Sequence, residues 1–420
     1  MSDQLEPLPG TADLWEPETS QWVFLERQAR EIFPRYGYCE LRTPVFERTE
    51  VFVRGIGGET DVVQKEMYTF TDRGGRSLTL RPEGTAGVMR AIANAGLQEG
   101  EEKRVFYIGP MFRGERPAAG RRRQFHQVGV ECVGKAAPAV DAENIAMLLH
   151  YLEALGITNG KLLLNTRGAA ADRPAMNQAL REHFAAHVAS MCPDCQRRFE
   201  TNISRMLDCK CEPCQGPILA APDVTAVMGE ASKAYFAAVR AHLDRLGVHY
   251  IVAPRLVRGL DYYEQTVFEV THHGLGAQSA MAGGGRYRIA LPGSDRTVEG
   301  VGFACGMERL LMVREHLRLA AHPAAAPQVY LVCLGEPALA AALPLAQQLR
   351  HAGLRVLAET APRSMKAQMR AANKAGARFA LIQGDDELAK GTLLCKDLAA
   401  STQEEIPVAA AADRLLAALA

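Results

Sequence analysis

Arginines, an amide and a carboxylate are concentrated in one short stretch, residues 104–132, which reads RVFYIGPMFRGERPAAGRRRQFHQVGVEC. Side chains alternate along a strand, so Gln127, Gly129 and Glu131 would share one face of a second strand. A glycine between two polar side chains leaves room for a ligand, and the guanidinium of Arg113, which closes the first strand, suits phosphate. We therefore expect a site for a phosphate beside a small polar ligand. The alternative is an edge strand with a solvated polar face.

A second group of reactive side chains is a cluster of cysteines. Five of the ten cysteines lie within residues 192–214, in the pattern C-x2-C, thirteen residues, then C-x-C-x2-C. Two close pairs at this separation are typical of a structural zinc site. The double C-x2-C set is formed by Cys192, Cys195, Cys211 and Cys214, and Cys209 could replace one of them. The alternative is a group of reduced thiols without a metal.

The elements that must position these residues fall into two regions of different pattern. Residues 1–320 read as an antiparallel sheet bounded by helices, with an Ala-rich helical insertion over about 155–245 that contains the cysteines. The Ala/Pro-rich residues 321–328 read as a linker. Residues 329–420 alternate strands with helices, as a small α/β domain does. The predicted fold class is therefore α+β, with an additional C-terminal α/β domain.

Local signals predict the individual elements near the expected site. The Asp-Arg-Gly-Gly turn that starts at Asp72 has the chemistry of a β-hairpin, and the segment Gly302–Leu311 reads as a helix. Further elements are expected as a helix over 18–33, a strand over 38–47 that is interrupted at Pro44, a hairpin over 65–80 and a helix that starts near Thr85.

Composition narrows the classes of protein. The 420 residues suggest two or three domains, and Lys plus Arg equals Asp plus Glu at 48 each, so nucleic acid could bind only through local patches. No apolar run is long enough to span a membrane. The N-terminus lacks the apolar core of a signal peptide, which predicts a cytoplasmic protein. In that compartment ten cysteines favour thiols or metal over disulfides.

One local patch of positive charge lies in the C-terminal region. Residues 350–378 carry seven lysines and arginines against a single acid, Glu359. Such a strip fits an RNA backbone. The alternative is a solvated helix face.

The nucleotide-binding motifs of parallel-sheet enzymes are missing. The sequence has no GxxxxGK[ST], which excludes a P-loop. The glycines Gly283–Gly285 do not stand between a strand and a helix in a GxGxxG pattern, so a dinucleotide-binding fold is not expected. An ATP site would therefore use arginines on an antiparallel sheet.

Six segments, in one order along the chain, carry a resemblance to a known family. They are the helix and Pro44 strand near the start, LTLRPEGTAG at 78–87, FRGERP…GRRRQFHQVGVE at 112–131, LVRGLDYYEQTVFEV at 256–270, AGGGRY at 282–287 and GVGFACGMERLL at 300–311. Over nearly its whole length the chain resembles the histidyl-tRNA synthetases, class II aminoacyl-tRNA synthetases of the bacterial type. The resemblance implies an antiparallel-sheet class II catalytic core with a helical insertion, a C-terminal α/β anticodon-binding domain and a homodimer.

The resemblance also implies a reaction and the residues that perform it. ATP with Mg²⁺ would activate L-histidine to histidyl-adenylate, and the histidine would pass to the 3′ end of tRNA(His). Arg258 and Arg113 would be catalytic, with Arg258 stabilising the charge that develops at the α-phosphate. The implied ATP-binding residues are Arg113, Glu115, Arg121 and Arg309. The implied histidine-binding residues are Glu83, Thr85, Gln127, Glu131, Arg258, Tyr262 and Tyr263.

Each of these motifs also has an ordinary structural explanation. Arg258 could pair with Asp261 or Glu264, the glycines 283–285 could form a bare turn, and the arginines 121–123 could be a solvated cluster. His126 could be a core histidine and is given no catalytic role. The chain departs from the family pattern at Arg288, where members often have Asp after the Arg-Tyr of AGGGRY, and the loop that follows, IALPGSDRT, looks short.

The competing function comes from a different class of protein. The regulatory subunit of ATP phosphoribosyltransferase is a non-catalytic protein that resembles the same core. It typically lacks the C-terminal domain and parts of the histidine-specific segments. Because both are present here, the ligase is the favoured function.

Overall fold

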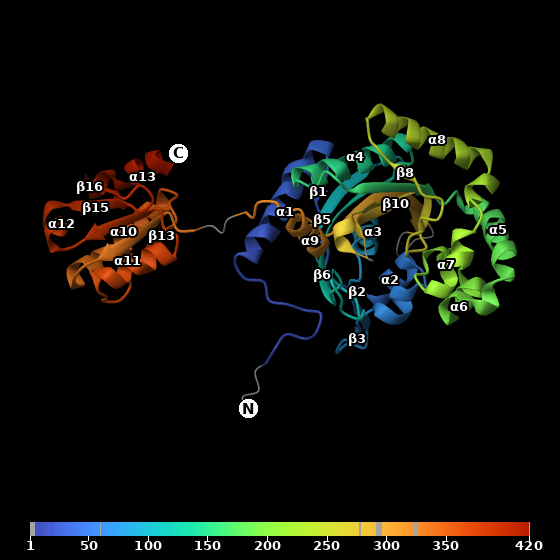
Figure 1. Cartoon of the computed structure of the whole chain (residues 1–420), viewed down its shortest axis with the longest axis horizontal. Helices are drawn as coiled ribbons and strands as arrows, with labels where there is room; N and C mark the ends of the chain where they lie inside the picture. Colours follow the sequence, from blue (N-terminus) through green and yellow to red (C-terminus); the bar gives the residue numbers. More distant parts are fainter. Residues whose placement is uncertain (1–4, 59, 277–278, 291–295, 323–325, 420) are drawn as a thin grey trace. The chain divides into compact units, whose positions relative to one another are not determined.

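The computed structural model describes residues 5–58, 60–276, 279–290, 296–322 and 326–419. The chain divides into two compact units, Met1–Ala321 and His322–Ala420, each with a hydrophobic core of its own (Figure 1). Residues 323–325 of the expected linker and 291–295 of the loop after AGGGRY lie outside the described residues. Within the described part, no helix combines the length and apolarity that a membrane crossing requires.

An eight-stranded sheet organises the first unit. Its strands follow the order β1-β5-β6-β11-β10-β9-β7-β8. The pairs from β5 to β7 are antiparallel, and the outer pairs β1–β5 and β7–β8 are parallel. The strands are β1 (Cys39–Glu40), β5 (Lys103–Phe112), β6 (Gln124–Val133), β7 (Lys161–Thr166), β8 (Ile251–Val252), β9 (Tyr263–Thr271), β10 (Ala280–Ala290) and β11 (Thr297–Gly306).

Four helices share one hydrophobic core with the main sheet: α1 (Glu18–Ile32), α4 (Pro138–Ala154), α8 (Glu230–Arg245) and α9 (Met307–His316) (Figure 1). The sequence explains how α1 packs, because Trp22, Leu25, Ala29 and Ile32 recur at helical spacing and are all buried. The chain leaves the helix through a turn that ends at Gly37, whose φ of +81° suits glycine.

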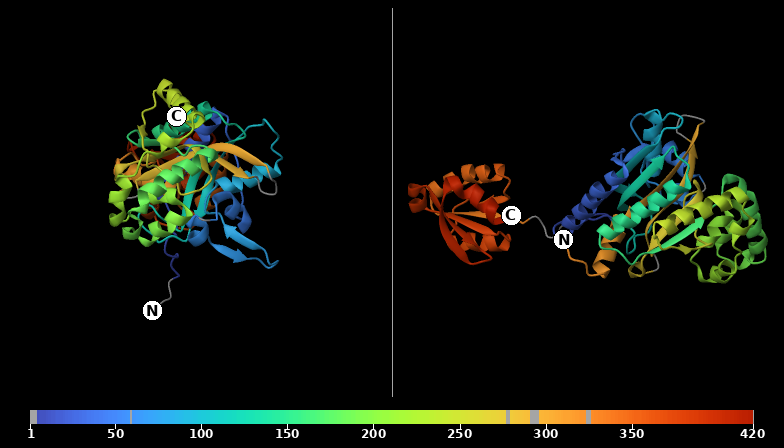
Figure 2. Two further views of the ribbon diagram at one scale, coloured as in Figure 1. Left: turned by 90° about the vertical axis from the view of Figure 1, so that its right-hand side faces the viewer. Right: turned by 90° about the horizontal axis from the view of Figure 1, so that it is seen from above.

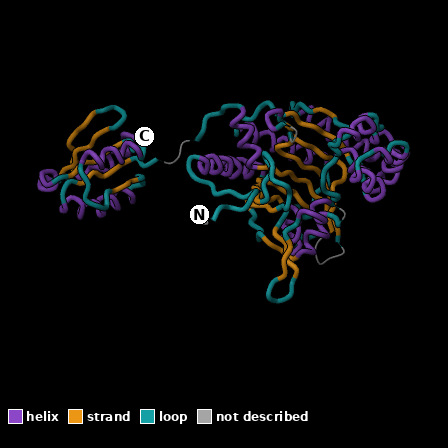
Figure 3. The backbone as a smooth tube through the Cα atoms, turned by 60° about the horizontal axis from the view of Figure 1, so that its bottom comes forward, coloured by secondary structure: helices purple, strands orange, loops and turns teal. Residues whose placement is uncertain are grey.

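The opposite face of the sheet is covered by α3 (Thr85–Asn94), which packs with α2 (Thr49–Ile56). Beside them lies a three-stranded sheet of order β2-β4-β3, made of β2 (Phe46–Arg48), β4 (Ser77–Leu80) and β3 (Thr69–Thr71). The β3–β4 hairpin projects from the first unit (Figure 2, Figure 3). Its turn is the predicted one, with Asp72 accepting backbone N–H groups of Gly74 and Arg76.

A row of small residues crosses the sheet on the face that α3 covers. Gly129, Ala304 and Gly283 stand in register on β6, β11 and β10, between Tyr107 of β5 and Glu269 of β9. A Cβ added at Gly129 would lie 2.4 Å from the Tyr107 ring, so a side chain there would displace the tyrosine. The row therefore forms a low floor between larger side chains.

The predicted face of β6 is confirmed, and its alternative as an edge strand is wrong. β6 pairs with β5 on one side and β11 on the other. Val128, Val130 and Cys132 are buried in the core that contains α1 and α4. Gln127 and Glu131 therefore point to the other face.

Two stretches differ from the sequence-based prediction. Lys161–Thr166, expected inside the helical insertion, is strand β7 and pairs with β9 in the main sheet. Residues 302–306, expected to be helical, belong to β11, and α9 begins only at Met307. In both cases long-range pairing with neighbouring strands determines the structure, although the local sequence has a helical pattern.

The insertion proper is smaller than predicted and has its own apolar cluster. It is built around α5 (Arg173–Ala185), α6 (Pro193–Thr201) and α7 (Glu212–Leu219). Helix α8, within the predicted insertion, instead packs on α4 of the main body. Four of the five clustered cysteines, Cys195, Cys209, Cys214 and the partly buried Cys192, belong to the apolar cluster of the insertion.

The second unit is an α/β domain around a five-stranded sheet of order β13-β12-β14-β15-β16. The predicted alternation of strands and helices is present. β16 was not expected because TQEEIP, with one buried residue in six, reads as polar. The elements are β12 (Val329–Cys333), α10 (Glu336–His351), β13 (Val356–Ala358), α11 (Met365–Lys374), β14 (Phe379–Gln383), α12 (Asp385–Lys390), β15 (Thr392–Asp397), β16 (Thr402–Pro407) and α13 (Ala411–Leu419).

The basic strip of this unit is partly engaged in intramolecular contacts. Arg363 pairs with Glu359, and Arg378 pairs with Asp397. Arg350 donates to a backbone carbonyl oxygen at the neighbouring strand. The strip is therefore partly structural, and both of its interpretations stay open.

A buried ion pair ties α4 to the main sheet. Asp141 of α4 is fully buried, and its carboxylate lies 2.5 Å from the guanidinium of Arg286 on β10. The second carboxylate oxygen accepts hydrogen bonds from Thr266 of β9 and Tyr235 of α8. The pair holds four elements in one arrangement, directly behind the glycines of β10.

Removal of this carboxylate should destabilise the first unit strongly. In Asp141→Ala the buried guanidinium of Arg286 loses its counter-charge, and we expect a loss of about 3–5 kcal/mol in the free energy of unfolding. Urea denaturation followed by tryptophan fluorescence measures it, because both tryptophans, Trp15 and Trp22, lie in the first unit. Arg27→Ala, which breaks an exposed pair with Glu31, should cost less than about 1 kcal/mol. Similar losses in both variants would contradict the assignment.

Candidate active site

The predicted site residues meet in two adjoining cavities over the floor of small residues. One has a volume of about 90 Å³ and the other about 280 Å³. Their linings share Arg113, Gln127, Arg258, Gly283 and Ala304. The two cavities therefore form one site with two ends, which we call the small cavity and the arginine cavity.

The small cavity is lined by all seven residues that the resemblance implied for histidine. They are Glu83, Thr85, Gln127, Glu131, Arg258, Tyr262 and Tyr263. Tyr107, Leu260 and Tyr287 line it as well and were not predicted. Gly129 gave a partial signal for Tyr107, because a glycine inside a strand marks the close approach of a neighbour. The sequence could not identify that neighbour, which depends on the register of β5 with β6.

Glu131 is the most unusual group of the small cavity. It is 2 % exposed, and its Oε1 accepts a 2.7 Å hydrogen bond from the hydroxyl of Thr85. Its Oε2 makes no hydrogen bond of ordinary geometry among the described residues, although the Tyr287 side chain interacts with the carboxyl. Burial raises the pKa of Glu131 to about 8, so the group is largely protonated at neutral pH. A protonated carboxyl can donate as well as accept, which suits a ring that carries both kinds of nitrogen.

Two further buried polar atoms at this site are unsatisfied. Gln127 Oε1 and Arg258 Nε have no hydrogen-bond partner within the described part of the chain. Buried polar groups are nearly always paired, and each unpaired one calls for an explanation. An acceptor, a donor and the carboxyl of Glu131 around one cavity match a small polar ligand with several hydrogen-bonding groups.

Glu83 connects the small cavity to the start of α3. Its two carboxylate oxygens accept the backbone N–H groups of Thr85 and Ala86, both at 2.8 Å. Burial raises its pKa. Because each oxygen has a second lone pair, Glu83 caps the helix and can still accept from an ammonium group in the cavity.

Arg258 lies between the two ends of the site. Its Nη1 is 2.5 Å from Glu269 Oε2, and its guanidinium lies over Gly283, where an added Cβ would be 2.6 Å away. The expected alternative partners are engaged elsewhere, since Asp261 accepts from Asn202 and Glu264 pairs with Arg173 and Arg288. Arg258 does form an ion pair, but with Glu269 rather than with Asp261 or Glu264. The glycines lie within strand β10, so their alternative as a bare turn is wrong.

The arginine cavity is lined by the four predicted ATP residues Arg113, Glu115, Arg121 and Arg309, with Arg122 beside them. Arg113 donates to the carbonyl oxygen of Pro82, and Arg309 donates to those of Gly120 and Ala280. Glu115 pairs with Arg121 at 2.9 Å and lies 3.8 Å from Arg113. The lining holds five guanidinium groups against three carboxylates, those of Glu115, Glu269 and Glu308, so the cavity keeps a net positive charge, which suits a polyphosphate.

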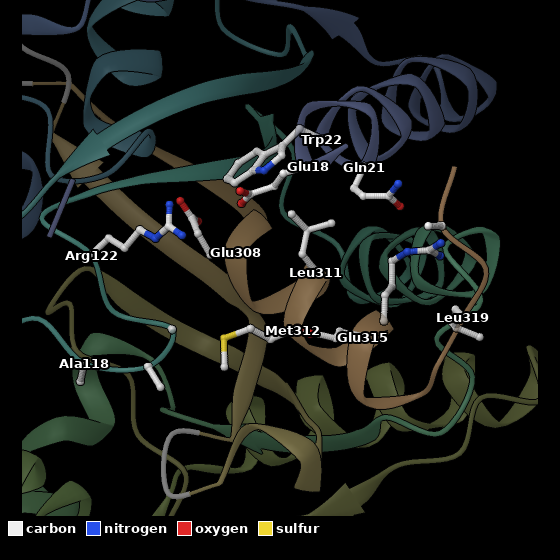
Figure 4. Close-up of a pocket in the computed structure, with 14 residues that line it drawn as sticks. Glu18, Gln21, Trp22, Ala118, Arg122, Glu308, Leu311, Met312, Glu315 and Leu319 are labelled. Carbon is white, nitrogen blue, oxygen red and sulfur yellow. The ribbon is translucent and has the colours of Figure 1, made fainter. Parts of the chain in front are cut away.

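The arginine loop is thus more than a solvated cluster. Arg121 is paired with Glu115, and Arg123 donates from Nε to the carbonyl oxygen of Glu115. Arg122 lines the arginine cavity and a third, larger cavity of about 610 Å³ between α1, the loop and α9 (Figure 4). His126 Nδ1 lies 3.2 Å from Glu308 Oε1. Glu308 lines the arginine cavity and the third cavity.

The departure at Arg288 leaves the site intact. Arg288 extends from β10 to Glu299 of the neighbouring strand β11 and to Glu264. Arg286 and Tyr287, which precede it, are buried on the two faces of the strand. The residue therefore belongs to an ion-pair network at the sheet rather than to either cavity.

The structure brings four cysteine sulfurs together and corrects the expected set at one position. The Sγ atoms of Cys192, Cys195, Cys209 and Cys214 all lie within 4.8 Å of one another. Cys211, which precedes α7, is exposed, whereas Cys209 is buried in the insertion. Sequence spacing favoured Cys211, which forms a C-x2-C pair with Cys214. In the structure the buried Cys209 is the one whose sulfur lies close to the other three. All ten cysteines are free.

Comparisons with known proteins agree along the whole chain. A family model described as histidyl-tRNA synthetase matches residues 10–310, and one described as anticodon binding domain matches 328–418. The histidine–tRNA ligase of Solidesulfovibrio magneticus is 49 % identical over 96 % of this chain and 95 % of that protein. That of Geobacillus thermodenitrificans is 44 % identical over 97 % of each. The crystal structure of apo Staphylococcus aureus histidyl-tRNA synthetase aligns with a TM-score of 0.81 at 35 % identity, covering 98 % of this chain and 100 % of that one.

The raised pKa of Glu131 predicts a pH-dependent stability of the ligand-free protein. From about pH 4.5 to 8 the folded protein keeps a proton that the unfolded chain has lost, so this contribution falls as pH rises and is gone above about pH 8. Glutamine does not titrate. The urea midpoint of Glu131→Gln, minus that of the wild type, should therefore increase from about pH 6 to 8 and then level off.

Tryptophan fluorescence of the first unit again provides the midpoints. The control is Glu31→Gln, the same change on the exposed face of α1. A difference for Glu131→Gln that varies with pH no more than that of the control would contradict the raised pKa.

Proposed function

Because the chain belongs to the histidyl-tRNA synthetase family, we propose that its two adjoining cavities join L-histidine to tRNA(His) at the expense of ATP. The protein is an aminoacyl-tRNA ligase that serves protein synthesis. The observation that carries the assignment of the cavities is the buried carboxyl of Glu131 in a small polar cavity that adjoins an arginine-lined one.

The reaction has two steps. An oxygen of the histidine carboxylate attacks the α-phosphorus of ATP, the bond from that phosphorus to the β-phosphate oxygen breaks, and diphosphate leaves with its electron pair. The terminal ribose hydroxyl of the tRNA then attacks the acyl carbon of the adenylate, loses its proton, and AMP leaves. Both steps depend on positioning and on stabilisation of charge at phosphorus.

The small cavity holds histidine by its two polar ends. Glu131 and Tyr263 contact the imidazole, whose two nitrogens need one donor and one acceptor. Glu83, Thr85 and Gln127 hold the ammonium group with acceptor oxygens, and Tyr262 lines the same cavity. A site built to hydrogen-bond a polar ligand rejects apolar isosteres by a factor on the order of 10⁴.

The arginine cavity holds ATP. Arg113 and Arg258 lie where the two cavities meet, so they contact the α-phosphate and the histidine carboxylate together. Arg309, Arg121 and Glu115 bind the rest of the nucleotide. Mg²⁺ that arrives with ATP supplies further neutralisation of the phosphates. Planar guanidinium groups suit both tasks, and lysine would not replace them.

We assign residues 1–320 to the catalytic domain and 329–420 to an anticodon-binding domain. The family-model match over 328–418 and the basic strip of the second unit support the latter. We propose a homodimer, on the resemblance of the helix and the Pro44 strand near the start of the chain to those of the family, and a cytoplasmic location. The alternative, a regulatory subunit of ATP phosphoribosyltransferase, is not favoured. A Bacillus halodurans structure described as an ATP phosphoribosyltransferase regulatory subunit/histidyl-tRNA synthetase is 20 % identical to this chain, which shows the common fold alone.

The cysteine cluster fits a structural zinc site. Four thiolate ligands in a tetrahedral arrangement are what Zn²⁺ takes in closed sites, and the sulfurs of Cys192, Cys195, Cys209 and Cys214 already converge. They belong to the apolar cluster of the insertion. Zinc there would stabilise the insertion and take no part in the reaction.

Histidine-dependent exchange of diphosphate into ATP tests the function and the role of Arg258. The wild type should catalyse the exchange, and no exchange with pure protein would overturn the ligase. Arg258→Ala should lower the exchange rate by about 10²–10³-fold, as loss of a group that stabilises transition-state charge does. The KM for ATP should change by less than about tenfold.

Three further variants separate this role from a structural one. Arg258→Ala/Glu269→Gln also removes the carboxylate that would be left unpaired, and it should remain slow. Arg258→Lys keeps the charge but loses the planar fork, and it should be impaired. Arg255→Ala, at an exposed arginine that donates to the carbonyl of Leu219, should exchange normally. If Arg258→Ala changes only the KM for ATP, the catalytic role is wrong.

Elemental analysis tests the zinc site. Protein purified without added metal should contain about one zinc per chain. Cys209→Ser should lose most of it, and Cys211→Ser, the matched change two residues away, should retain it. Wild-type protein without zinc, or equal retention in both variants, would reject the proposed ligands.

A further inference from the structure

Three histidines meet at the end of α9, outside the residues that line either cavity. His272 precedes, and His273 begins, the short helix η7 (His273–Leu275), which follows β9 in the chain, and His316 is the last residue of α9. The ring of His272 is stacked on that of His273, with 4.5 Å between centroids. The ring of His316 stands edge-on to both. Residues more than forty positions apart in the chain are thus gathered at one point.

The two exposed rings face each other through their Nε2 atoms. His273 Nε2 and His316 Nε2 are 3.4 Å apart. That separation is longer than the usual range of nitrogen hydrogen bonds, about 2.7–3.2 Å. Two imidazole nitrogens that each lie about 2.0–2.1 Å from one tetrahedral ion are roughly 3.3–3.4 Å apart. The spacing therefore fits two ligands of one metal ion better than a direct hydrogen bond.

Neighbouring groups hold both rings in this position. The backbone N–H of Gly274 donates to Nδ1 of the buried His272, whose Nε2 is 3.0 Å from Asn159 Oδ1. His272 is therefore fully engaged and supports His273 by stacking. Gly274 leaves space for the third ring, because an added Cβ would lie 2.6 Å from the ring of His316. Ligands fixed before binding lose little entropy when the ion arrives.

The surroundings also suit a cation. His316 ends α9, where the last carbonyl groups carry the negative end of the helix dipole. Arg314, the cationic side chain two residues earlier, is buried and donates to the carbonyl oxygens of Leu155 and Ala320. Both ligand histidines are exposed, so water can complete the coordination shell and the ion need not be fully dehydrated.

We propose that His273 and His316, the histidine pair, bind one divalent transition-metal ion of the zinc class, with water as the remaining ligands. The ion ties η7 to α9. Helix α9 also carries Arg309, whose Nη1 is 2.6 Å from the carbonyl oxygen of Ala280, the first residue of β10. The histidine pair and Arg309 thus join α9 at two points to the segment that leads from β9 into β10.

Zinc binding by untagged full-length protein tests the site. Equilibrium dialysis at micromolar free Zn²⁺ should show one ion fewer per chain in His316→Gln, and in His273→Gln, than in the wild type. Because the cysteines are unchanged in all variants, this difference of one does not depend on whether they bind zinc or on the ligase activity. His249→Gln, at another exposed histidine of the first unit, should bind as many ions as the wild type.

The substitutions are at exposed positions, so the urea midpoint of the zinc-free variants should match that of the zinc-free wild type. Added Zn²⁺ should then raise the midpoint more in the wild type than in His316→Gln. Equal zinc content in the wild type, His273→Gln and His316→Gln would overturn the site. The same loss of one ion in His249→Gln would overturn it as well.

Discussion

On the face of the main sheet that carries the site, large polar side chains are buried beside glycine or alanine on a neighbouring strand. Gly129, Ala304 and Gly283 lie in one row and leave the space that Tyr107 and the guanidinium of Arg258 occupy. One row further, a Cβ at Gly302 would lie 2.2 Å from Glu131 Oε2. The glycines are thus a packing requirement of the sheet, and the cavity above them follows from that requirement.

The two ends of the site differ in electrostatics for the same physical reason. In the small cavity burial favours the neutral carboxyl of Glu131, so the group acts through hydrogen bonds. In the arginine cavity guanidinium groups cannot lose their charge, and backbone carbonyls hold several of them in place. A neutral, selective end and a cationic end are what a polar amino acid and a polyphosphate respectively need.

Sequence patterns predicted what depends on local periodicity. The alternation of 127, 129 and 131 predicted the face of β6 that lines the cavities, and the arginine loop predicted the gathering of guanidinium groups. Partners set by strand register could not be predicted. Glu269 meets Arg258 because it lies directly opposite Gly283 on β10, whereas the sequence offered the nearer Asp261 and Glu264. Cys209 replaces Cys211 for a similar reason, since burial in the insertion decides which sulfurs converge.

Helix α9 connects separate parts of the main sheet through contacts along its length. Its first turn presents Glu308 to the backbone N–H of His126 on β6, its next residue Arg309 reaches Ala280, and its last residue meets His273. The helix is therefore fastened at its start to the strand of the ligand face and at its end to the segment between β9 and β10. A shift of β6 or of that segment would move Arg309, so the shape of the arginine cavity depends on contacts made well outside it.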